Sequence, residues 1–320
     1  MTAEDMGEGT DFVHIPVLFD EVMESLNIDP DGTYVDGTAG GGGHAKGIAD
    51  RLSAIGRLVA IDQDEEAIEA AGKRLEGSRC RTDIVRGNFR NIRPILRELE
   101  IEEVDGILLD IGVSSHQLDE GDRGFSYIKD GPLDMRMDRR NPVTAADIIR
   151  SYDEARLAGI IRKYGEERYA GRIAKAIKEA LKRREIDTTL ELAGIIEKAV
   201  PSKAAHSGGS PAMRTFQALR IEVNHELDAL EESLDVMIGM LKSGGRLSVI
   251  TFHSLEDRIV KETFRRNENP CTCPPDFPVC ICGRKPTGRC VGRKPTVAKE
   301  EEIRANKRAH SAKLRCFEKI

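Results

Sequence analysis

The sequence predicts an α/β fold in which a mainly parallel β-sheet is covered by helices on both faces and is interrupted by an all-helical insertion. Short apolar segments alternate with segments of helical periodicity over the first third of the 320 residues. The alternation stops after Asp110, and roughly ninety residues without a strand follow, enough for a separate small domain. Strands apolar on both faces and separated by helices are typical of a buried parallel sheet.

The first third contains four expected strands and three expected helices. The strands are short, rich in Val, Ile and Leu, and fall at residues 32–36, 57–62, 82–86 and 104–110. The helices have apolar residues at helical spacing and fall at residues 44–55, 65–75 and 92–99. This order places successive strand–helix units in one sheet.

After the fourth strand, residues 112–138 form a long polar loop rich in glycine, and residues 145–200 are helical throughout. A small-residue loop at 204–211, a helix at 215–240 and a fifth strand at 246–252 follow. Residues 267–296 are expected to be loop, and residues 311–317 a last edge strand. We therefore divide the chain into a first α/β part (1–118), a helical insertion (119–212) and a second α/β part (213–320).

Charge is distributed unevenly along the chain. The net charge is −6, but residues 283–320 hold twelve Lys and Arg against four Asp and Glu, a balance of +8 that leaves −14 elsewhere. Such a basic tail suits a polyanion such as nucleic acid, although it equally fits a solvated surface segment. No run approaches the ~20 apolar residues of a membrane helix, and residues 1–11 lack a secretory signal. We expect a cytoplasmic protein whose seven cysteines are reduced or bind metal.

A glycine-rich loop, residues 36–44, joins the first strand to the first helix and suits an adenosine cofactor. Glycine allows close approach of a ligand to the backbone, and Asp62 at the end of the second strand can accept hydrogen bonds from two ribose hydroxyls. The spacing Gly40-x-Gly42-x-x-Ala45 also fits a dinucleotide fingerprint. An NAD-dependent oxidoreductase is therefore one interpretation of this loop.

Two residues favour S-adenosylmethionine over NAD. Asp36 precedes the glycines, where it could face the ammonium of a methionine moiety but would repel a pyrophosphate. Asn88 and Phe89 follow the third strand, where an amide and a ring could hold adenine. The alternatives are that Asp36 is a turn residue and that Phe89 belongs to the core.

Asp110 ends the fourth strand, at the edge where a parallel sheet presents substrate. Methyl transfer to an exocyclic amine needs acceptors for its N–H bonds, and the Asp110 carboxylate with a carbonyl near Ile111 or Gly112 would supply them. Carbon methylation of cytosine would instead need a nucleophilic cysteine, and none lies near this strand end in the sequence.

Long motifs across nearly the whole chain resemble the ribosomal RNA small subunit methyltransferase H, or MraW, family. The motifs with the longest uninterrupted agreement are residues 14–18, 36–38, 42–44, 60–62, 105–118, 123–126, 131–138, 214–224 and 252–258. The family usually has serine where this chain has Ala45 and Thr251, and both differences are small.

The resemblance implies a Rossmann-like, S-adenosylmethionine-dependent methyltransferase that modifies the N4 amine of a cytidine in the decoding region of 16S rRNA, within the small ribosomal subunit. The helical insertion would then help to recognise rRNA, and a homodimer is left open. Cofactor contacts are implied at Gly42, Gly43, His44, Asp62, Phe89, Asp110 and Gln117. His44 and Gln117 come from the resemblance alone. A non-catalytic ribosome-assembly factor remains a third class of interpretation.

Three further features have open alternatives. His253, which follows the fifth strand, could accept the proton released on transfer and is counted with Asp110 as a catalytic candidate, or it could cap a helix. Phe125 and Tyr127 could stack on an extruded base or be buried. Cys271, Cys273, Cys280 and Cys282 form two C-x-C pairs that could bind zinc, but this spacing is tight, and we assign no metal site from sequence.

Overall fold

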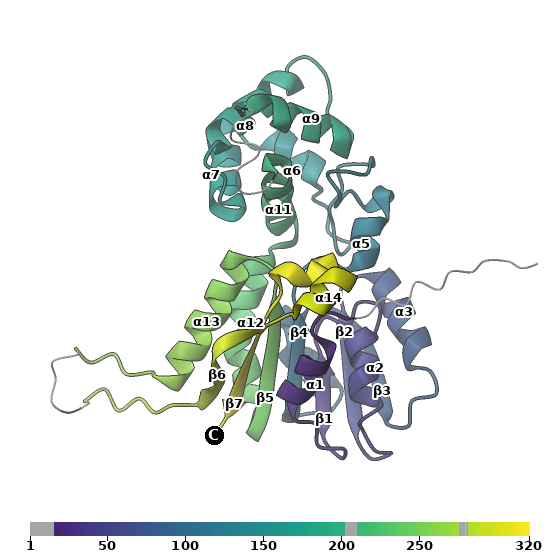
Figure 1. The fold of residues 1–320 in the computed structure, drawn as a ribbon, viewed down its shortest axis with the longest axis vertical. Coiled ribbons are helices and arrows are strands. Elements are labelled where there is room, and N and C mark those ends of the chain that lie inside the picture. The colour runs from purple at the N-terminus through teal and green to yellow at the C-terminus, as the bar shows by residue number, and fades with distance from the viewer. Residues whose placement is uncertain (1–15, 202–209, 275–278, 280) are drawn as a thin grey trace, which may run out of the picture.

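A computed structural model describes residues 16–201, 210–274, 279 and 281–320. Within these residues, seven strands form one sheet in the order β3-β2-β1-β4-β5-β7-β6 (Figure 1). The first five strands run parallel, and β7 pairs antiparallel with both β5 and β6. The strands are β1 (Thr33–Asp36), β2 (Arg57–Asp62), β3 (Arg81–Arg86), β4 (Val104–Asp110), β5 (Leu241–Thr251), β6 (Gly288–Val297) and β7 (Lys313–Lys319).

Helices cover both faces of the sheet, as the apolar strands require. One face packs against α4 (Ile92–Glu98), α12 (Glu226–Met240) and α13 (Ser254–Glu268). The other face packs against α1 (Phe19–Leu26), α2 (Gly43–Ala49) and α3 (Glu65–Leu75), and near β7 against the segment of α14 (Glu300–Ala305) and η3 (Lys307–Ser311). A short η1 (Phe89–Asn91) leads into α4. These features confirm the predicted α/β class.

The strand order reverses between β1 and β4, which are hydrogen-bonded neighbours in the centre of the sheet. In open α/β sheets, chain connections leave in opposite directions on the two sides of such a point, and ligands bind in the crevice outside the carboxyl ends of the strands. Asp36 is the last residue of β1, and Asp110 is the last residue of β4. The sheet topology therefore brings the two predicted carboxylates to the usual ligand position of such folds.

The inserted helices form a second layer over the carboxyl edge of the sheet (Figure 1). The connection from β4 contains α5 (Ser115–Asp119) and η2 (Gly121–Arg123), and the layer itself contains α6 (Ala145–Ser151), α7 (Glu154–Gly165), α8 (Ala170–Leu181), α9 (Thr189–Ala199) and α11 (Pro211–Asn224). It has its own apolar core, which extends from Phe125 to Val223. The predicted domain boundary at residue 212 therefore falls just inside α11, a helix that packs with the insertion.

Several predicted elements match closely, and others needed correction. Strands 57–62 and 104–110 and helix 65–75 have the predicted bounds. The single helix predicted at 215–240 is wrong, because His225 has a left-handed conformation (φ 51°) that separates α11 from α12. Residues that favour helix occur throughout this segment, so its sequence does not show where one helix ends and the next begins.

The prediction of an edge strand at 311–317 is also corrected. A strand forms at β7, but it lies inside the sheet, because β6 pairs with its outer side. Strand β6 overlaps residues 267–296, which were predicted to be loop. Pro295 and the basic residues of β6 are not typical of a strand, so the sequence does not indicate this pairing. Among the described residues, no helix is both long enough and apolar enough to span a membrane.

The position of β7 inside the sheet, between β5 and β6, can be tested by mutation. Phe317 is fully buried and its ring centroid lies 5.2 Å from that of Phe264 in α13. We expect Phe317→Ala to lower the free energy of unfolding by ~3–5 kcal/mol, because a large buried ring is replaced by a cavity. Chemical denaturation measures this change. Ile320→Ala, at an exposed site, should change stability little, and equal small effects of the two variants would contradict the placement of β7.

Candidate active site

The glycine-rich loop ties the ends of β1 and β4 together. The Gly37 N–H donates to the Leu108 carbonyl at 2.9 Å, and the Thr38 N–H donates to Asp36 Oδ1 at 3.1 Å. The Thr38 hydroxyl oxygen in turn accepts from the Asp110 N–H at 2.6 Å. The two carboxylates are therefore held at neighbouring strand ends by one short loop. Sequence analysis did not identify Thr38 as the residue that connects them.

Asp36 is a buried carboxylate with an incomplete set of partners. Its side chain is 1% exposed, and Oδ2 has no hydrogen-bond partner within the part of the chain that the structure describes. Burial raises the pKa of Asp36 to about 7, although the nearby His44 and the Thr38 N–H act in the opposite direction. A cationic group placed beside Oδ2 would favour the ionised form.

His44 lies between the two strand-end carboxylates. Its Nε2 is 3.0 Å from the Val17 carbonyl oxygen, and its Nδ1 is 3.5 Å from Asp110 Oδ2. Since both nitrogens face acceptors, the doubly protonated ring fits best. Burial opposes that charge, but the hydrogen bond and charge of Asp110, with the charge of Asp36, raise the pKa of His44 overall.

Asp110 has one engaged oxygen and one unengaged oxygen. Oδ2 faces His44, whereas the buried Oδ1 has no partner among the described residues. After Asp110, the Ile111 N–H donates to the Ile250 carbonyl at 3.0 Å, and Gly112 has a φ of 134°, which other residues rarely adopt. The strand end thus presents an acceptor on a fixed backbone.

Asp62, at the end of β2, contacts the backbone of the glycine-rich loop. Its Oδ2 accepts from the Gly40 N–H at 2.8 Å and its Oδ1 from the Asp64 N–H at 2.9 Å. Burial raises the pKa of Asp62 to about 6, against the lowering effect of these backbone donors. Each oxygen retains a second lone pair, so the carboxylate can still accept from a ribose hydroxyl.

The glycines of the loop have different roles. A Cβ at Gly40 or Gly41 would have no close contact (at most Thr38 O at 3.9 Å), so the backbone is open to a ligand there. At Gly42 a Cβ would lie 3.0 Å from the Ala71 Cα, and at Gly43 it would lie 2.4 Å from the Pro16 Cγ. Gly42 and Gly43, the two glycines predicted to contact the cofactor, are therefore required first by packing within the protein.

Phe89 and Asn88 follow β3 as predicted. Phe89 is 9% exposed, belongs to the apolar cluster on the α12 face, and lies close to Gly37. Asn88 donates to the Gln63 side-chain oxygen at 2.8 Å and accepts from the Arg90 N–H at 2.9 Å. The core alternative for Phe89 agrees with this burial, and contact with adenine stays a prediction.

Gln117 belongs to a buried network that sequence analysis missed. Its amide donates to Asp64 Oδ2 at 2.7 Å, and its oxygen accepts from the Ser114 N–H at 3.1 Å in a capping box. Arg123, 2% exposed, also binds Asp64 Oδ2 at 2.7 Å and reaches Glu66 at 2.8 Å. The network fastens the loop after β4 to the start of α3. A sequence cannot show this pairing, because Arg123 and Asp64 lie far apart in the chain.

His253 caps helix α13. Its Nδ1 accepts from the Glu256 N–H at 3.4 Å, and Nε2 lies 3.0 Å from Glu256 Oε1. Glu256 is fully buried; burial raises its pKa, but the charge and hydrogen bond of His253 and the charge of Arg220 lower it overall. The Nδ1 contact is the helix cap that the capping alternative predicts, whereas the buried Nε2, although close to Glu256 Oε1, has no hydrogen-bond partner among the described residues.

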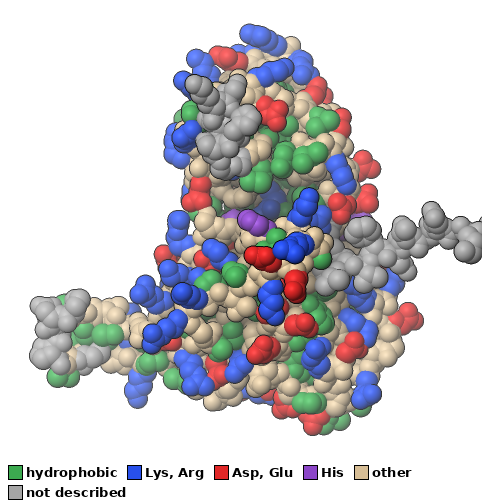
Figure 2. Space-filling model, in the orientation of Figure 1, with side chains coloured by type: hydrophobic (Ala, Val, Ile, Leu, Met, Phe, Trp, Pro, Cys, Tyr) green, Lys and Arg blue, Asp and Glu red, His purple; other side chains and the backbone are tan. Residues whose placement is uncertain are grey.

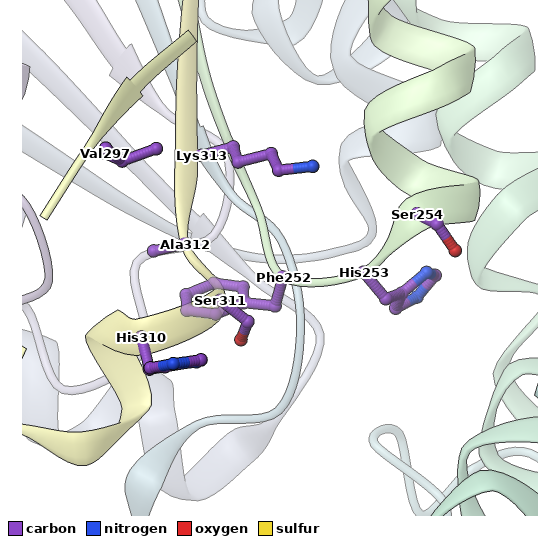
Figure 3. Close-up of a pocket in the computed structure, with 8 residues that line it drawn as sticks. All are labelled: Phe252, His253, Ser254, Val297, His310, Ser311, Ala312 and Lys313. Carbon is purple, nitrogen blue, oxygen red and sulfur yellow. The ribbon is translucent and has the colours of Figure 1, made fainter. Parts of the chain in front are cut away.

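A cavity of about 300 Å³ lies beside the carboxyl end of β5 (Figure 3). The Phe252 ring extends toward Ser311 and His310, whereas the His253 ring points the other way, on the α13 side. Phe252 also borders Gly112, since a Cβ there would be 3.2 Å from the Phe252 ring. The cavity therefore adjoins the backbone that follows Asp110.

Two aromatic candidates for base stacking belong to the insertion core. Phe125 is 5% exposed, and Tyr127 packs edge-on against Phe216 at 6.1 Å between ring centroids. The structure therefore shows the buried alternative for Phe125, whereas Tyr127 is only partly buried.

The fold and the site together define a class of enzyme. The β1–β4 switch point brings together a buried carboxylate with one oxygen that has no hydrogen-bond partner among the described residues, an aspartate at the end of β2 and an open glycine backbone. These groups fit the ammonium, ribose and methionine parts of S-adenosylmethionine, which is a cation, better than they fit a pyrophosphate. They are the features of an S-adenosylmethionine-dependent methyltransferase.

Comparison with known proteins identifies the family. The model of the MraW methylase family matches residues 11–320, and the chain belongs to this family. S-adenosylmethionine is accordingly its cofactor. The oxidoreductase and non-catalytic interpretations are not supported by this membership.

Relatives with similar sequences cover almost the full chain. The Ribosomal RNA small subunit methyltransferase H 2 of Agathobacter rectalis is 57% identical over 97% of this chain and 99% of its own length. The Ribosomal RNA small subunit methyltransferase H of Lachnospira eligens is 56% identical over 98% and 100%. A solved rRNA methylase of Streptococcus thermophilus shares 12% identity over 94% of this chain and 93% of its own, with a TM-score of 0.41, and no argument rests on it.

The buried Asp36 gives a pH prediction for the ligand-free protein. Folding raises the pKa of this carboxyl from 3.8 to about 7, so between these values the folded chain holds a proton that the unfolded chain has lost. Stability should therefore fall as pH rises through that window, with a slope of up to ~1.4 kcal/mol per pH unit from this group. We expect Asp36→Asn to flatten the fall, measured by chemical denaturation at a series of pH values.

His44 and Asp62 also have raised pKa values and contribute slopes of the same sign, which remain in the variant. The exposed Asp122→Asn provides a control that should keep the wild-type slope. An unchanged slope in Asp36→Asn would show that this carboxyl does not titrate in the window.

Proposed function

We propose that this methyltransferase modifies the N4 amine of a cytidine in the decoding region of 16S rRNA, within the small ribosomal subunit in the cytoplasm. Relatives at 54–57% identity carry the name of a ribosomal RNA small subunit methyltransferase, which supports the class of substrate. The observation that carries the amine assignment is the unpartnered, buried Oδ1 of Asp110 at the switch point of the sheet.

Amine methylation requires the enzyme to position a weak nucleophile. The N4 lone pair of cytosine is conjugated with the ring, and acceptors for its N–H bonds turn it toward the methyl carbon. Asp110 Oδ1 is the acceptor that we assign to one N–H, and a backbone carbonyl near Ile111 or Gly112 is assigned to the other. His44 keeps the Asp110 carboxylate in place through the 3.5 Å contact with Oδ2. Formation of the N–C bond would be matched by loss of the S–C bond of the methyl donor, with its electron pair left on sulfur. The amine then loses one proton, which we assign to Asp110 Oδ1.

The cofactor assignments follow from the same crevice. When bound, S-adenosylmethionine supplies an electrophilic methyl group on its sulfonium sulfur. Asp36 would hold the ammonium, Asp62 the ribose hydroxyls, and Phe89 one face of adenine. Gly40 and Gly41 would allow close approach of the backbone.

The remaining residues predicted at the cofactor site receive positioning roles. Gly42 and Gly43 maintain the loop through their packing, and His44 orients Asp110. Gln117 orients Asp64 and the start of α5.

Three cysteines of the α/β part, Cys80, Cys290 and Cys316, do not favour carbon methylation. Cys80 precedes β3 and so lies at the amino edge, opposite Asp110, and Cys316 lies within β7. Burial raises the pKa of Cys316 to about 11, and burial with the Glu268 charge does the same for Cys290. Such thiols are poor nucleophiles at neutral pH.

RNA recognition is assigned to the surfaces around the crevice. The inserted helices lie over the carboxyl edge of the sheet, so their surface is close to the assigned nucleotide site at Asp110 (Figure 1). The cavity lined by Phe252, His310 and Lys313 offers rings and a cation beside this path. An unpaired nucleotide of rRNA could stack there, as single-stranded RNA does on aromatic side chains.

The experiment that tests the function is mass mapping of 16S rRNA from cells that lack this protein. We expect one cytidine of the decoding region to lose an N4-methyl group, which the wild-type gene restores. Asp110→Asn should fail to restore it, with a loss of transfer rate of at least ~10²-fold, because a neutral amide lacks the charge of the carboxylate and cannot take up the proton.

Glu102→Gln, at an exposed position just before the opposite end of β4, serves as the matched control and should restore the modification. Unchanged 16S rRNA in the deletion strain would contradict the substrate. Full restoration by Asp110→Asn would instead contradict the role of Asp110.

His253 provides a separate test, because capping and proton transfer make different demands. Asparagine is also a good helix cap, so His253→Asn should keep methyl transfer to small subunits within a few-fold of wild type. His253→Ala should lose ~1 kcal/mol of stability, since it removes the cap. If His253→Asn kept its stability but lost transfer by orders of magnitude, the imidazole would be the proton acceptor and the capping role insufficient.

A further inference from the structure

Between α13 and β6, the described residues 269–274 and 281–287 form an extension that leaves the body of the protein (Figure 1). The base of the extension is closed by Thr287, whose N–H donates to the Asn267 carbonyl at 3.0 Å and whose hydroxyl contacts Asn267 Oδ1 at 2.8 Å. Its described side chains contribute nothing to the three apolar cores, and Val279 and Ile281 are 70% and 74% exposed. Apolar burial therefore does not account for its shape.

Three cysteines from the two described segments of the extension lie close together. The sulfur atoms of Cys271, Cys273 and Cys282 all lie within 4.8 Å of one another. Cys271 and Cys282, eleven residues apart, have their sulfurs 3.9 Å from each other. The Ile281 N–H also donates to Cys273 Sγ at 3.3 Å. Cys280 lies outside the described residues.

The sulfur separations match those around a tetrahedral metal ion. With Zn–S bonds of ~2.3 Å, two ligands of a tetrahedron are ~3.8 Å apart, close to the Cys271–Cys282 separation. A disulfide would require ~2.05 Å between the two sulfurs. Backbone N–H donors to sulfur, as at Cys273, are the kind of secondary contact that stabilises a coordinated thiolate.

From this geometry we propose a structural zinc site formed by the thiolates of Cys271, Cys273 and Cys282. Zinc is the ion that thiolate ligands at tetrahedral separations select when no redox chemistry is needed. On binding, each thiol gives up its proton to solvent and the sulfur lone pair forms the bond to Zn²⁺. The ion lies beyond the far end of α13 from His253, and so does not take part in methyl transfer.

The zinc ion would supply the folding energy that the extension does not obtain from a core. Metal binding orders small segments of this kind, because no preformed site exists in the unfolded chain. Arg284 and Lys285 follow the cluster directly, and Lys and Arg side chains gather where the extension joins the body (Figure 2). The ion would thus hold a basic arm in a defined shape.

The test is the metal content of the full-length protein, purified without chelator and analysed by inductively coupled plasma mass spectrometry. We expect about one zinc ion per chain, and most of it should be lost in Cys271→Ser, Cys273→Ser and Cys282→Ser. Cys290→Ser, in the neighbouring strand β6, is the matched control and should retain the metal. Cobalt substitution should give thiolate charge-transfer absorption in wild type and in Cys290→Ser alone.

The folding of each variant is checked by circular dichroism, and limited proteolysis follows the extension itself. A chelator should expose residues 269–287 to cleavage in wild type while the rest of the chain stays intact. The proposal would be overturned if the protein contained no zinc, if iron or copper occupied the site instead, or if Cys271 and Cys282 formed a disulfide. Zinc retained by all three variants of the proposed ligands would also overturn it.

Discussion

The structure depends on holding several carboxylates together at one buried edge of a sheet. A carboxylate removed from water is costly unless it is hydrogen-bonded or paired with a cation. At the β1–β4 edge, Asp36 and Asp110 each keep one buried oxygen without a partner among the described residues, and the His44 imidazole contacts the other oxygen of Asp110. Burial therefore holds the pKa of Asp36 far above its usual value. The methyl donor that this family uses carries positive charge, so its binding would offset the electrostatic cost that the ligand-free fold retains.

Much of this edge could be predicted from sequence, because parallel sheets impose simple geometry. Once strands are recognised at 57–62 and 104–110 from their apolar residues, the residue that ends each strand must lie at the ligand edge. Asp62 and Asp110 were found in this way, and so was Asp36. What periodicity could not give is the set of contacts between loops. Thr38 bridging to Asp110, or Arg123 reaching Asp64, depends on how the chain returns after each strand, and no local pattern encodes that return.

The glycine loop shows a related limit. Its composition indicates a ligand-binding turn, and the motif draws attention to Gly42 and Gly43. In the structure these two are the crowded positions, against Ala71 and Pro16, whereas Gly40 and Gly41 face open space. A glycine can be required because a ligand packs closely against its backbone, or because another residue of the protein does. The sequence alone does not distinguish these two cases. Substitutions at Gly42 or Gly43 would therefore act first through the fold of the loop.

The relation between the two layers rests on the junction of α11 and α12. α11 contributes to the core of the insertion, and α12 contributes to the core of the sheet, with the reversal at His225 between them. Arg220 and Glu226 form a bidentate ion pair across this reversal, at 2.8 and 2.9 Å. Asn224 adds bonds of 2.8 Å to the Met135 carbonyl and the Met137 N–H, in the loop that leads from β4. These part-buried polar contacts therefore join α11 to α12 and to the loop that leads from β4. The sequence predicted one continuous helix at 215–240. The break in that helix, between α11 and α12, is what positions the second layer over Asp110.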